Sequence, residues 1–432
     1  FLLRDLLKNY LPAGETLPAV PAALPVIEIP EFHFHKVAPL FSNLPEAKQT
    51  VDIQPMEQFN QGWGTILYRT TLPETTLAGT TLKITEVHDW AQIYADGKLL
   101  ARLDRRKGEF TTTLPALKKG TQLDILVEAM GRVNFDKSIH DRKGITEKVE
   151  LISGNQTKEL KNWTVYNFPV DYSFIKDKKY SDTKILPTMP AYYKSTFTLD
   201  KVGDTFLDMS TWGKGMVWVN GHAMGRFWEI GPQQTLFMPG CWLKEGENEI
   251  LVLDLKGPTR ASIKGLKKPI LDVLREKAPE THRKDGEKLK LTGEKVGHEG
   301  AFTPGNGWQE VRFATPVKGR YFCLEALSPQ ANDNIAAIAE FDVLGADGKP
   351  VSREHWKIRY ADSEETRSGN RTADKIFDLQ ESTFWMTVDN VPYPHQLVID
   401  LSKVENVTGF RYLPRAEKGY PGMIKEYRVY VK

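Results

Sequence analysis

Cysteine is scarce in this sequence, and long apolar runs are missing. Cys241 and Cys323 are the only cysteines among 432 residues, so at most one disulfide can form and a disulfide framework is excluded. Polar or charged residues interrupt every apolar stretch well short of the ~18 residues that cross a bilayer, which argues against a membrane helix. Neither sign of charge prevails, because 58 Lys and Arg accompany 56 Asp and Glu. The sequence therefore lacks the basic field that would attract nucleic acid.

Motifs that carry catalysis or bind cofactors are also missing. The sequence has no glycine-rich phosphate loop, no Gly-Xaa-Ser-Xaa-Gly elbow and no zinc-ligand spacing. His33 and His35 share one face of a predicted strand, but no third ligand is placed to complete a metal site. Two pairs of glutamates come without a predicted concave pocket: Glu247 with Glu249, and Glu364 with Glu365. We therefore expect no catalytic residue in this chain and no required cofactor.

Short strands joined by tight turns are what the sequence does contain. Met216–Val219 is apolar, Asn220-Gly221 is the dipeptide of a type I′ turn, and an apolar pattern resumes from Met224 to Trp228. This order predicts a β-hairpin. Asp96-Gly97, followed by Arg102, repeats the same pattern earlier in the chain. We therefore expect two β-sandwiches of one design to follow each other.

The hairpin and its flanks also resemble a known domain. Three segments are similar to the galactose-binding-like β-sandwich that follows the catalytic barrel in β-galactosidases of glycoside hydrolase family 35: Val217-Trp-Val-Asn-Gly-His-Ala-Met-Gly-Arg-Phe-Trp, Gly231-Pro-Gln-Gln-Thr-Leu and Gly246-Glu-Asn-Glu. Gly131-Arg-Val-Asn-Phe resembles the first sandwich of that family, at the stretch that approaches the barrel. Residues 1–11 resemble the last helix of the barrel, and no part of the chain has the strand–helix alternation over ~250 residues that a whole barrel needs.

The last third of the chain resembles a different module. Four segments match in order and spacing the discoidin-like carbohydrate-binding module, also called the coagulation factor five/eight C-type domain: Ala373-Asp-Lys-Ile-Phe-Asp-Leu, Pro394-His-Gln-Leu-Val-Ile-Asp-Leu, Val407-Thr-Gly-Phe-Arg-Tyr-Leu-Pro-Arg and Gly422-Met-Ile-Lys-Glu-Tyr-Arg-Val-Tyr-Val. The stretch before it, residues 288–350, has further strand-like segments that suggest an incomplete copy or an extension packed on this module.

These observations predict an all-β fold made of tandem galactose-binding-like jelly-roll β-sandwiches and a discoidin-like β-sandwich, after a short helical remnant of a missing TIM barrel. The expected parts are residues 1–30 (helix remnant and Pro-rich linker), 31–155 (first sandwich), 156–260 (second sandwich), 261–350 (linker and partial sandwich) and 351–432 (discoidin-like module). Within the linker, the segment Ile270–Glu276 predicts a helix.

Candidate sugar ligands follow from the resemblance to the discoidin-like module. Sugars are bound by aromatic faces and by groups that hydrogen bond hydroxyls, and in such modules these groups lie on loops at one end of the sandwich. The exposed candidates are Tyr360, Arg367, Asn370, Arg371, Asn390, Tyr393, Lys418 and Tyr420. Phe384 and Trp385 resemble the module's core aromatic position, and Arg411 and Arg415 resemble framework arginines that hold loops through backbone hydrogen bonds.

The resemblance implies two further kinds of site. Residues expected at an interface with the barrel are Asn134, Arg226, Phe227 and Trp228. Discoidin-like modules often carry a structural calcium ion, and the residues that match its ligands in type are Asp378, Thr383 and Glu426. The usual Gly-Asp or Gly-Asn after the first Asp is replaced by Leu379-Gln380, which removes a flexible turn and one ligand.

The resemblance implies a part of a β-galactosidase that hydrolyses terminal non-reducing β-D-galactosyl residues with retention. Its two catalytic glutamates would lie in the barrel, so we expect this chain to be inactive alone and to supply accessory and carbohydrate-binding domains. The expected partners are β-galactoside-containing glycans and the barrel of the same enzyme, without nucleic acid or a membrane span. Family habit suggests a periplasmic, extracellular or cell-surface location. The alternative is a free-standing carbohydrate-binding or adhesion protein without hydrolase activity.

Overall fold

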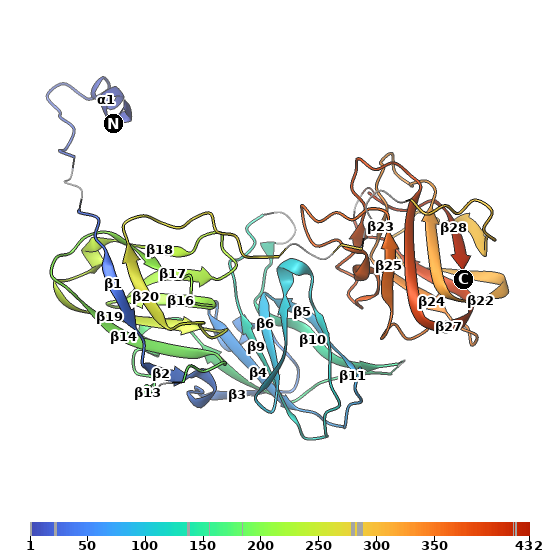
Figure 1. The fold of residues 1–432 in the computed structure, drawn as a ribbon, viewed down its shortest axis with the longest axis horizontal. Helices are drawn as coiled ribbons and strands as arrows, with labels where there is room; N and C mark the ends of the chain where they lie inside the picture. The colour runs from blue at the N-terminus through green and yellow to red at the C-terminus, as the bar shows by residue number, and fades with distance from the viewer. Residues whose placement is uncertain are drawn as a thin grey trace. The chain divides into compact units, whose positions relative to one another are not determined.

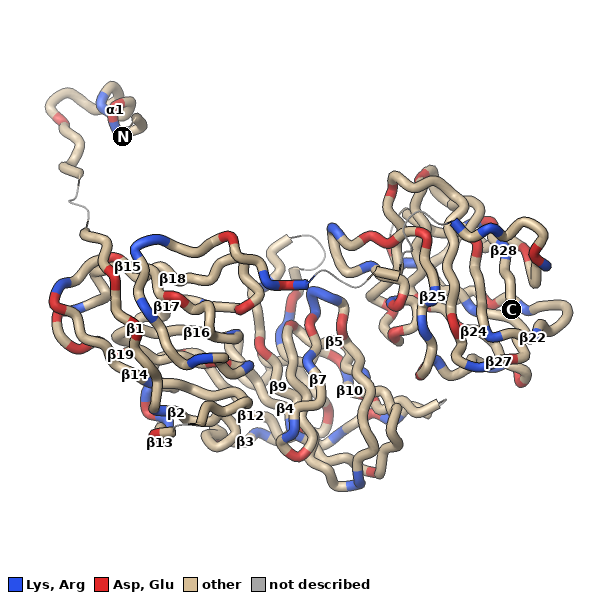
Figure 2. Tube along the Cα trace, in the orientation of Figure 1, with Lys and Arg blue, Asp and Glu red and all other residues tan. Residues whose placement is uncertain are grey.

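The computed structural model describes residues 2–20, 24–135, 139–154, 156–183, 185–277, 281–282, 288–417, 419 and 421–432. Its elements are almost all strands, which confirms the all-β prediction. The chain separates into two compact units, residues 1–44 with 170–276, and residues 45–169 with 277–432. Figure 1 shows the strands, and Figure 2 shows that basic and acidic residues are interspersed along the whole trace, as the balanced composition predicts.

The first sandwich is built from two sheets within residues 45–169. Its larger sheet has the order β3 (Ala47–Thr50), β12 (Trp163–Phe168), β4 (Thr65–Thr71), β9 (Gln122–Glu128), β6 (Trp90–Ala95) and β7 (Lys98–Asp104). Its smaller sheet has the order β11 (Gln156–Glu159), β10 (Gly144–Ser153), β5 (Thr81–His88) and β8 (Thr111–Thr113). The short helices η2 (Met56–Phe59) and η3 (Arg105–Lys107) lie in its connections. Alternate side chains of both sheets meet in one core, in which Tyr68 and Trp163 are fully buried.

The second sandwich also consists of two sheets. One has the order β13 (Ser181–Asp182), β2 (Lys36–Pro39), β14 (Ala191–Leu199), β19 (Gly246–Asp254), β16 (Lys214–Val219) and β17 (His222–Trp228). The other has the order β1 (Ile29–His33), β20 (Ser262–Leu266), β15 (Thr205–Asp208) and β18 (Thr235–Met238). The short helices are η1 (Leu40–Ser42), α2 (Tyr172–Ile175) and η5 (Gly240–Trp242). Buried Trp212 lies at the centre of the core, where its indole N–H donates to the carbonyl of Ser262 at 2.9 Å.

The predicted hairpin at the centre of this sandwich is confirmed. Strands β16 and β17 pair antiparallel, and Asn220 and Gly221 between them both have positive φ, at 49° and 85°. A type I′ turn requires positive φ at both central residues, which is why this dipeptide occurs here. The earlier Asp96-Gly97 turn has the same signs of φ, at 44° and 77°.

The C-terminal sandwich has one long sheet and one small one. The long sheet has the order β21 (His298–Ala301), β28 (Glu426–Val431), β22 (Gln309–Ala326), β27 (His395–Leu413) and β24 (Glu340–Leu344), and β25 (Lys357–Ala361) also pairs with β27. The small sheet pairs β23 (Ala337–Ile338) with β26 (Trp385–Met386), and η6 (Ala373–Phe377) lies nearby in the chain. Its core is rich in stacked aromatic rings, such as Phe302 on Tyr412 with centroids 4.2 Å apart.

The sheets divide the chain at other points than the boundaries expected from the sequence. Strands β1 and β2 pair with β20 and β14, so residues 29–39 belong to the second sandwich although they precede the first (Figure 1). Strand β12, expected in the second sandwich, pairs with β3 and β4 of the first. Residues 298–344 supply β21, β22 and β24 to the same sheet as β27 and β28, rather than an incomplete copy.

The predicted helix at Ile270–Glu276 is wrong. These residues are extended, because their backbone bonds to the segment after β17: the amide of Gln234 donates to the carbonyl of Ile270 at 2.9 Å, and that of Arg275 to Ile230 at 2.7 Å. Helix α1 (Leu2–Lys8) agrees with the helical pattern expected at the start of the chain, and it buries none of its residues. Across the described residues, no helix is both long and apolar enough to cross a membrane.

Candidate functional site: a clamped loop and an arginine pair

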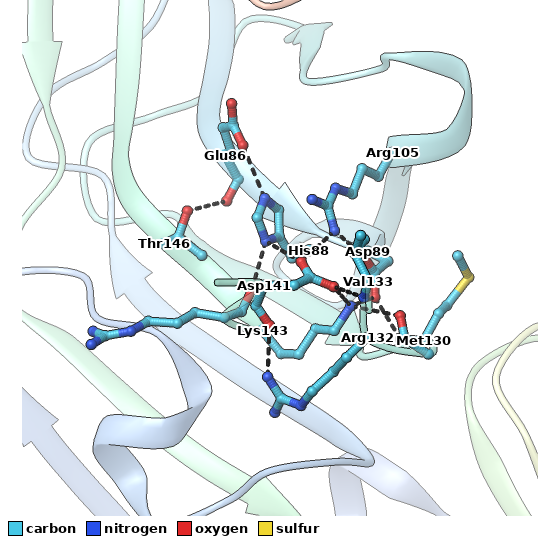
Figure 3. Close-up of polar contacts among 12 residues, drawn as sticks. Glu86, His88, Asp89, Arg105, Met130, Arg132, Val133, Asp141, Lys143 and Thr146 are labelled. Carbon is cyan, nitrogen blue, oxygen red and sulfur yellow. Dashed lines mark hydrogen bonds and ion pairs between the residues drawn. The ribbon is translucent and has the colours of Figure 1, made fainter. Parts of the chain in front are cut away.

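A cluster of buried charges lies at one end of the first sandwich. We call Asp89, Arg105, Asp141 and Lys143 the charge cluster (Figure 3). Asp89 follows β5, Arg105 begins η3, and the other two immediately precede β10. Only 2% of Asp89 and none of Lys143 is exposed. The cluster brings together residues that are up to 54 positions apart in the chain.

Each cation of the cluster contacts both carboxylates. The Nζ atom of Lys143 lies 2.6 Å from Oδ2 of Asp89 and 2.8 Å from Oδ2 of Asp141. The Nη1 atom of Arg105 lies 2.8 Å from Oδ1 of Asp89 and 2.7 Å from Oδ1 of Asp141. The two positive and two negative charges balance, so each buried ion has the partners that it needs to offset the loss of water.

The pKa shifts of Asp141 and Arg105 follow from this pairing. Burial disfavours the charged carboxylate of Asp141, but hydrogen bonds from Lys143, the amide of Val133 and Arg105 outweigh it and hold its pKa well below the ordinary value. Burial also works against the charge of Arg105, and its bonds to the two carboxylates raise its pKa. Next to the cluster, the hydrogen bond from His88 lowers the pKa of Glu86. The charged forms are therefore the stable ones.

The charge cluster fixes the backbone of the loop at residues 130–133. The amide of Met130 donates to Asp89 at 2.6 Å, and the amide of Val133 donates to Asp141 at 3.0 Å. Lys143 Nζ donates to the carbonyl of Gly131 at 3.1 Å. A loop whose backbone groups are bonded to buried charges has little conformational freedom left.

The side chain of Arg132 joins the loop at residues 130–133 to a second loop, which carries Gly62 and Trp63. Its Nη1 atom donates to the carbonyl of Asp141 and its Nη2 atom to the carbonyl of Gly62, both at 2.6 Å. Its guanidinium also pairs with Glu57 at 2.7 Å. The loop that carries Trp63 is thereby held beside residues 131–135.

The side chains at the tip of these two loops are exposed. Phe135 is 80% exposed, Trp63 is 45% exposed, and Val133 is 37% exposed. We call residues 131–135 together with Trp63 the clamped tip. The tip thus combines exposed apolar side chains with a backbone that is bonded to buried charges.

The residues expected at a barrel interface have different environments. Asn134 is exposed in the clamped tip, and Arg226 is exposed on β17. Trp228 is half-buried, and Nζ of Lys214 lies 4.0 Å from the centroid of its ring. Phe227 points the other way, into the core of the second sandwich, where its ring meets Trp212 edge-on at 6.3 Å. Alternation along a strand explains why Phe227 cannot share the outward face of its neighbours.

The candidate sugar ligands of the C-terminal sandwich also separate into groups. Arg367 and Asn390 are exposed, whereas Asn370, Arg371 and Tyr393 are half-buried. Tyr393 donates its hydroxyl to the carbonyl of Ile335 at 2.6 Å, so it has a structural partner. Tyr360 is 5% exposed and offers no ring face to solvent. Lys418 and Tyr420 lie outside the described residues.

Two arginines come together around one phenylalanine at this end of the sandwich. The Cζ atoms of Arg371 and Arg415 lie 5.0 Å and 4.5 Å from the centroid of the Phe384 ring. Their Nη1 atoms contact the sulfur of Met386 at 3.4 Å and 3.3 Å. We call Arg371 and Arg415 the arginine pair.

This arrangement corrects two expectations from the sequence. Phe384 is half-buried against the arginine pair instead of lying in the core, while Trp385 does lie in the core and donates to the carbonyl of Ser363 at 2.9 Å. Among the described residues, Arg415 contacts Phe384, Met386 and the carboxylate of Glu417, and it bonds no backbone carbonyl there. Arg411 likewise pairs with the carboxylate of Asp342. Sequence reasoning missed the arginine pair because 44 positions separate its members, from 371 to 415.

The expected calcium ligands do not form one group in the described contacts. The hydroxyl of Thr383 donates to both carboxylate oxygens of Asp378, at 3.0 Å and 2.8 Å. Burial, followed by the charge of Glu340, raises the pKa of Asp378 well above its ordinary value. Glu426 is exposed and accepts from Ser328 at 2.8 Å. Within the described part of the chain, no three His, Cys, Asp or Glu residues are arranged to hold a metal ion.

Comparison with known protein families identifies the three sandwiches. Residues 54–169 match the model "Beta-galactosidase, first all-beta domain", and residues 190–248 match "Beta-galactosidase, galactose-binding domain". Residues 360–432 match "F5/8 type C domain". Two of the three sandwiches thus match domain families of β-galactosidases. The last sandwich is an F5/8 type C domain, as the discoidin-like pattern predicts.

Curated relatives agree with these matches. The chain is 32% identical over 329 residues to β-galactosidase from Bos taurus, covering 66% of this chain and 47% of that protein. It is 33% identical over 238 residues to β-galactosidase from Xanthomonas manihotis, covering 55% of this chain and 38% of the relative. With human β-galactosidase-1-like protein 2 it shares 34% identity over 205 residues, covering 46% and 30% of the two chains. The chain therefore spans less than half the length of these relatives.

Removing the central cation should destabilise the first sandwich. In the Lys143→Met variant, Asp89 and Asp141 lose a buried partner, and we expect a loss of about 3–5 kcal/mol in unfolding free energy. Hydrogen exchange of peptides from residues 45–169 measures this loss, and exchange should rise most at residues 130–133. The matched control is Lys158→Met, which removes an exposed pair with Glu74 and should cost under about 1 kcal/mol. Equal exchange in both variants would contradict a clamping role.

The stability of the first sandwich should depend on Asp141 at acidic pH. The pKa of Asp141 is depressed in the folded state, whereas an unfolded Asp titrates near about 3.9. The charged carboxylate therefore contributes stability above about pH 4, and this contribution is lost as the pH falls towards the depressed folded pKa. Urea unfolding between pH 7 and pH 3 should show a steeper loss for the unmodified chain than for Asp141→Asn. Parallel pH profiles would show that Asp141 contributes nothing to this dependence.

Proposed function

We propose that this chain is the accessory region of a β-galactosidase that hydrolyses terminal non-reducing β-D-galactosyl residues with retention. The observation that carries the proposal is the match of two successive sandwiches to two β-galactosidase domain families. In this proposal the two sandwiches brace a catalytic barrel, and the F5/8 type C domain binds glycan. The substrate glycans contain β-galactosides, and the enzyme acts in the periplasm or outside the cell.

The carboxylates of the chain support a non-catalytic role. Retaining hydrolysis needs two carboxyl groups ~5 Å apart, one as acid and base and the other as nucleophile. Glu249 is engaged by Lys194 at 2.5 Å and by the Tyr172 hydroxyl at 2.6 Å. Glu364 accepts from the amide of Ala373 at 2.7 Å and is buried. Both glutamates thus have structural partners, and the proposal places the catalytic pair in the barrel.

The clamped tip supports contact with the barrel. Its apolar side chains are exposed while its backbone is bonded to the charge cluster, so binding would cost little loop ordering. Asn134 belongs to this tip, and Arg226 and Trp228 supply a second contact on the outward face of β17 in the proposal.

The alternative function is that of a free-standing carbohydrate-binding or adhesion protein. The F5/8 type C match favours it, because that domain alone could provide glycan binding. The two functions differ in what the gene encodes before Phe1. A continuous reading frame for a barrel supports the enzyme, and a start codon with a signal peptide supports the adhesion protein.

The purified chain should bind galactan and leave a chromogenic β-galactoside uncleaved. The physical reason is that the acid and nucleophile pair is expected in the barrel. Product release and galactan affinity are measured on the same sample, and a preparation of the complete enzyme serves as the positive control. Hydrolysis that copurifies with the chain through successive columns would overturn the proposed division of roles.

Replacing the exposed ring of the clamped tip by a small polar side chain should weaken the proposed contact with the barrel. In the complete enzyme, Phe135→Ser removes an 80% exposed ring whose burial would contribute about 1–3 kcal/mol. We expect a lower melting temperature of the barrel and reduced kcat/KM. The control is Ile185→Ser, which removes an 83% exposed side chain from the second sandwich and should change neither. If the two variants behave alike, the tip is not an interface.

A further inference from the structure

The arginine pair places two positive charges side by side at the loop end of the F5/8 type C domain. Both Nη1 atoms contact the single sulfur atom of Met386, so the two guanidiniums are close neighbours. Like charges at this separation repel, and partial burial reduces the screening by water. Burial, and then the charge of Arg371, lowers the pKa of Arg415. The fold therefore keeps two like charges as close neighbours.

The carboxylates nearby pair with only one of the two guanidiniums. Arg415 forms an ion pair with Glu417, but Arg371 has no carboxylate partner among the described residues. Glu365, which precedes the loop, accepts the amides of Arg367 at 2.5 Å and Ser368 at 3.0 Å and so closes its own turn. This site thus differs from the charge cluster of the first sandwich, where cations and carboxylates balance.

Donors of Arg371 remain available, and those of Arg415 remain available apart from Nη2, which pairs with Glu417. Each guanidinium has five N–H donors in one plane, and stacking on a ring uses the face of that plane rather than its edge. The bond of each Nη1 to Met386 is made to sulfur, a weak acceptor. A planar oxyanion is the group that such edges bind best, because two parallel charge-assisted hydrogen bonds form at once.

We propose that the arginine pair binds an anionic sugar, such as a uronic acid or a sulfated galactose, through its carboxylate or sulfate oxygens. This inference rests on the proposed glycan binding of the same domain and specifies its ligand class. A neutral galactose would hydrogen bond the same donors but would leave the repulsion between the guanidiniums in place. An anion removes the repulsion, so the pair selects the acidic sugar over the neutral one.

An acidic glycan fits the surroundings of the pair better than an anionic lipid surface does. Membrane binding needs exposed apolar side chains that enter the bilayer beside the charges. Among the described residues 356–432, the only large apolar side chain that is prominently exposed is Val404, on β27. The loops that carry Arg371, Phe384 and Arg415 expose none among their described residues. The described part of the site therefore offers cations without an exposed large apolar side chain.

Calorimetric titration of the full chain tests this inference. The probes are galacturonate, galactose 6-sulfate and galactose, together with vesicles of phosphatidylserine and phosphatidylcholine. We expect at least one acidic sugar to bind about tenfold more tightly than galactose at low salt. The preference should shrink as salt is raised, because the Debye length falls to about 10 Å at 0.1 M. The two acidic probes show whether carboxylate or sulfate is the preferred group.

Two variants and a control locate the effect. Arg371→Met should reduce the preference for the acidic sugar over galactose about tenfold. Arg371→Lys keeps the charge but loses the planar fork, and it should retain part of the preference. Arg428→Met is the control, because that arginine lies on β28 and pairs with Glu299. Circular dichroism verifies that each variant is folded.

The outcomes separate this inference from the proposed function. If galactose binds as tightly as the acidic sugars, or Arg371→Met leaves the preference intact, the arginine pair is not an anion site while glycan binding stands. If no sugar and no galactan binds, both proposals fail. If the chain binds phosphatidylserine vesicles and none of the sugars, the ligand is an anionic lipid and the inference is overturned.

Discussion

The buried ammonium of Lys143 between the carboxylates of Asp89 and Asp141 is the interaction on which the first sandwich depends for its shape at one end. A fully buried charge is tolerated only when its partners are in place, so these side chains cannot move independently. Because the same carboxylates accept the amides of Met130 and Val133, this constraint passes directly to the loop backbone. The backbone that leads to Phe135 is thus held by charges in the interior.

Local turn chemistry was predictable from the sequence, and strand partners far apart in the chain were not. Asn220-Gly221 predicts its own hairpin because positive φ is a property of those two residues. By contrast, Ile29 pairs with Gly265, and nothing in either segment specifies the other. The boundaries of the second sandwich therefore could not follow from composition or from proline-rich segments. The extended Ile270–Glu276 has the same origin, since bonds to residues 230–234 override its helical pattern.

The candidate sites were likewise predictable only in part from the sequence. The family resemblance located Gly131-Arg-Val-Asn-Phe and the loops of the last domain, but it did not show which side chains meet there. Phe227 and Trp228 are adjacent in the sequence, and only the strand's alternation assigns one to the core and the other outward. Arg415, which resembles a framework residue, becomes part of a site only because the fold brings Arg371 to the same phenylalanine.

The charge cluster and the arginine pair differ in whether their cations are matched by carboxylates, and we assign them different roles on this basis. In the charge cluster, two cations meet two carboxylates, every ion is bonded, and the result is rigidity. In the arginine pair, Arg415 pairs with Glu417, whereas Arg371 has no carboxylate partner among the described residues. The positive charge of Arg371 is therefore left to attract an anion from outside the chain. A fold gains no stability from placing like charges together, whereas a binding site gains selectivity from it. The charge left unbalanced by the fold is therefore the feature that points to a ligand.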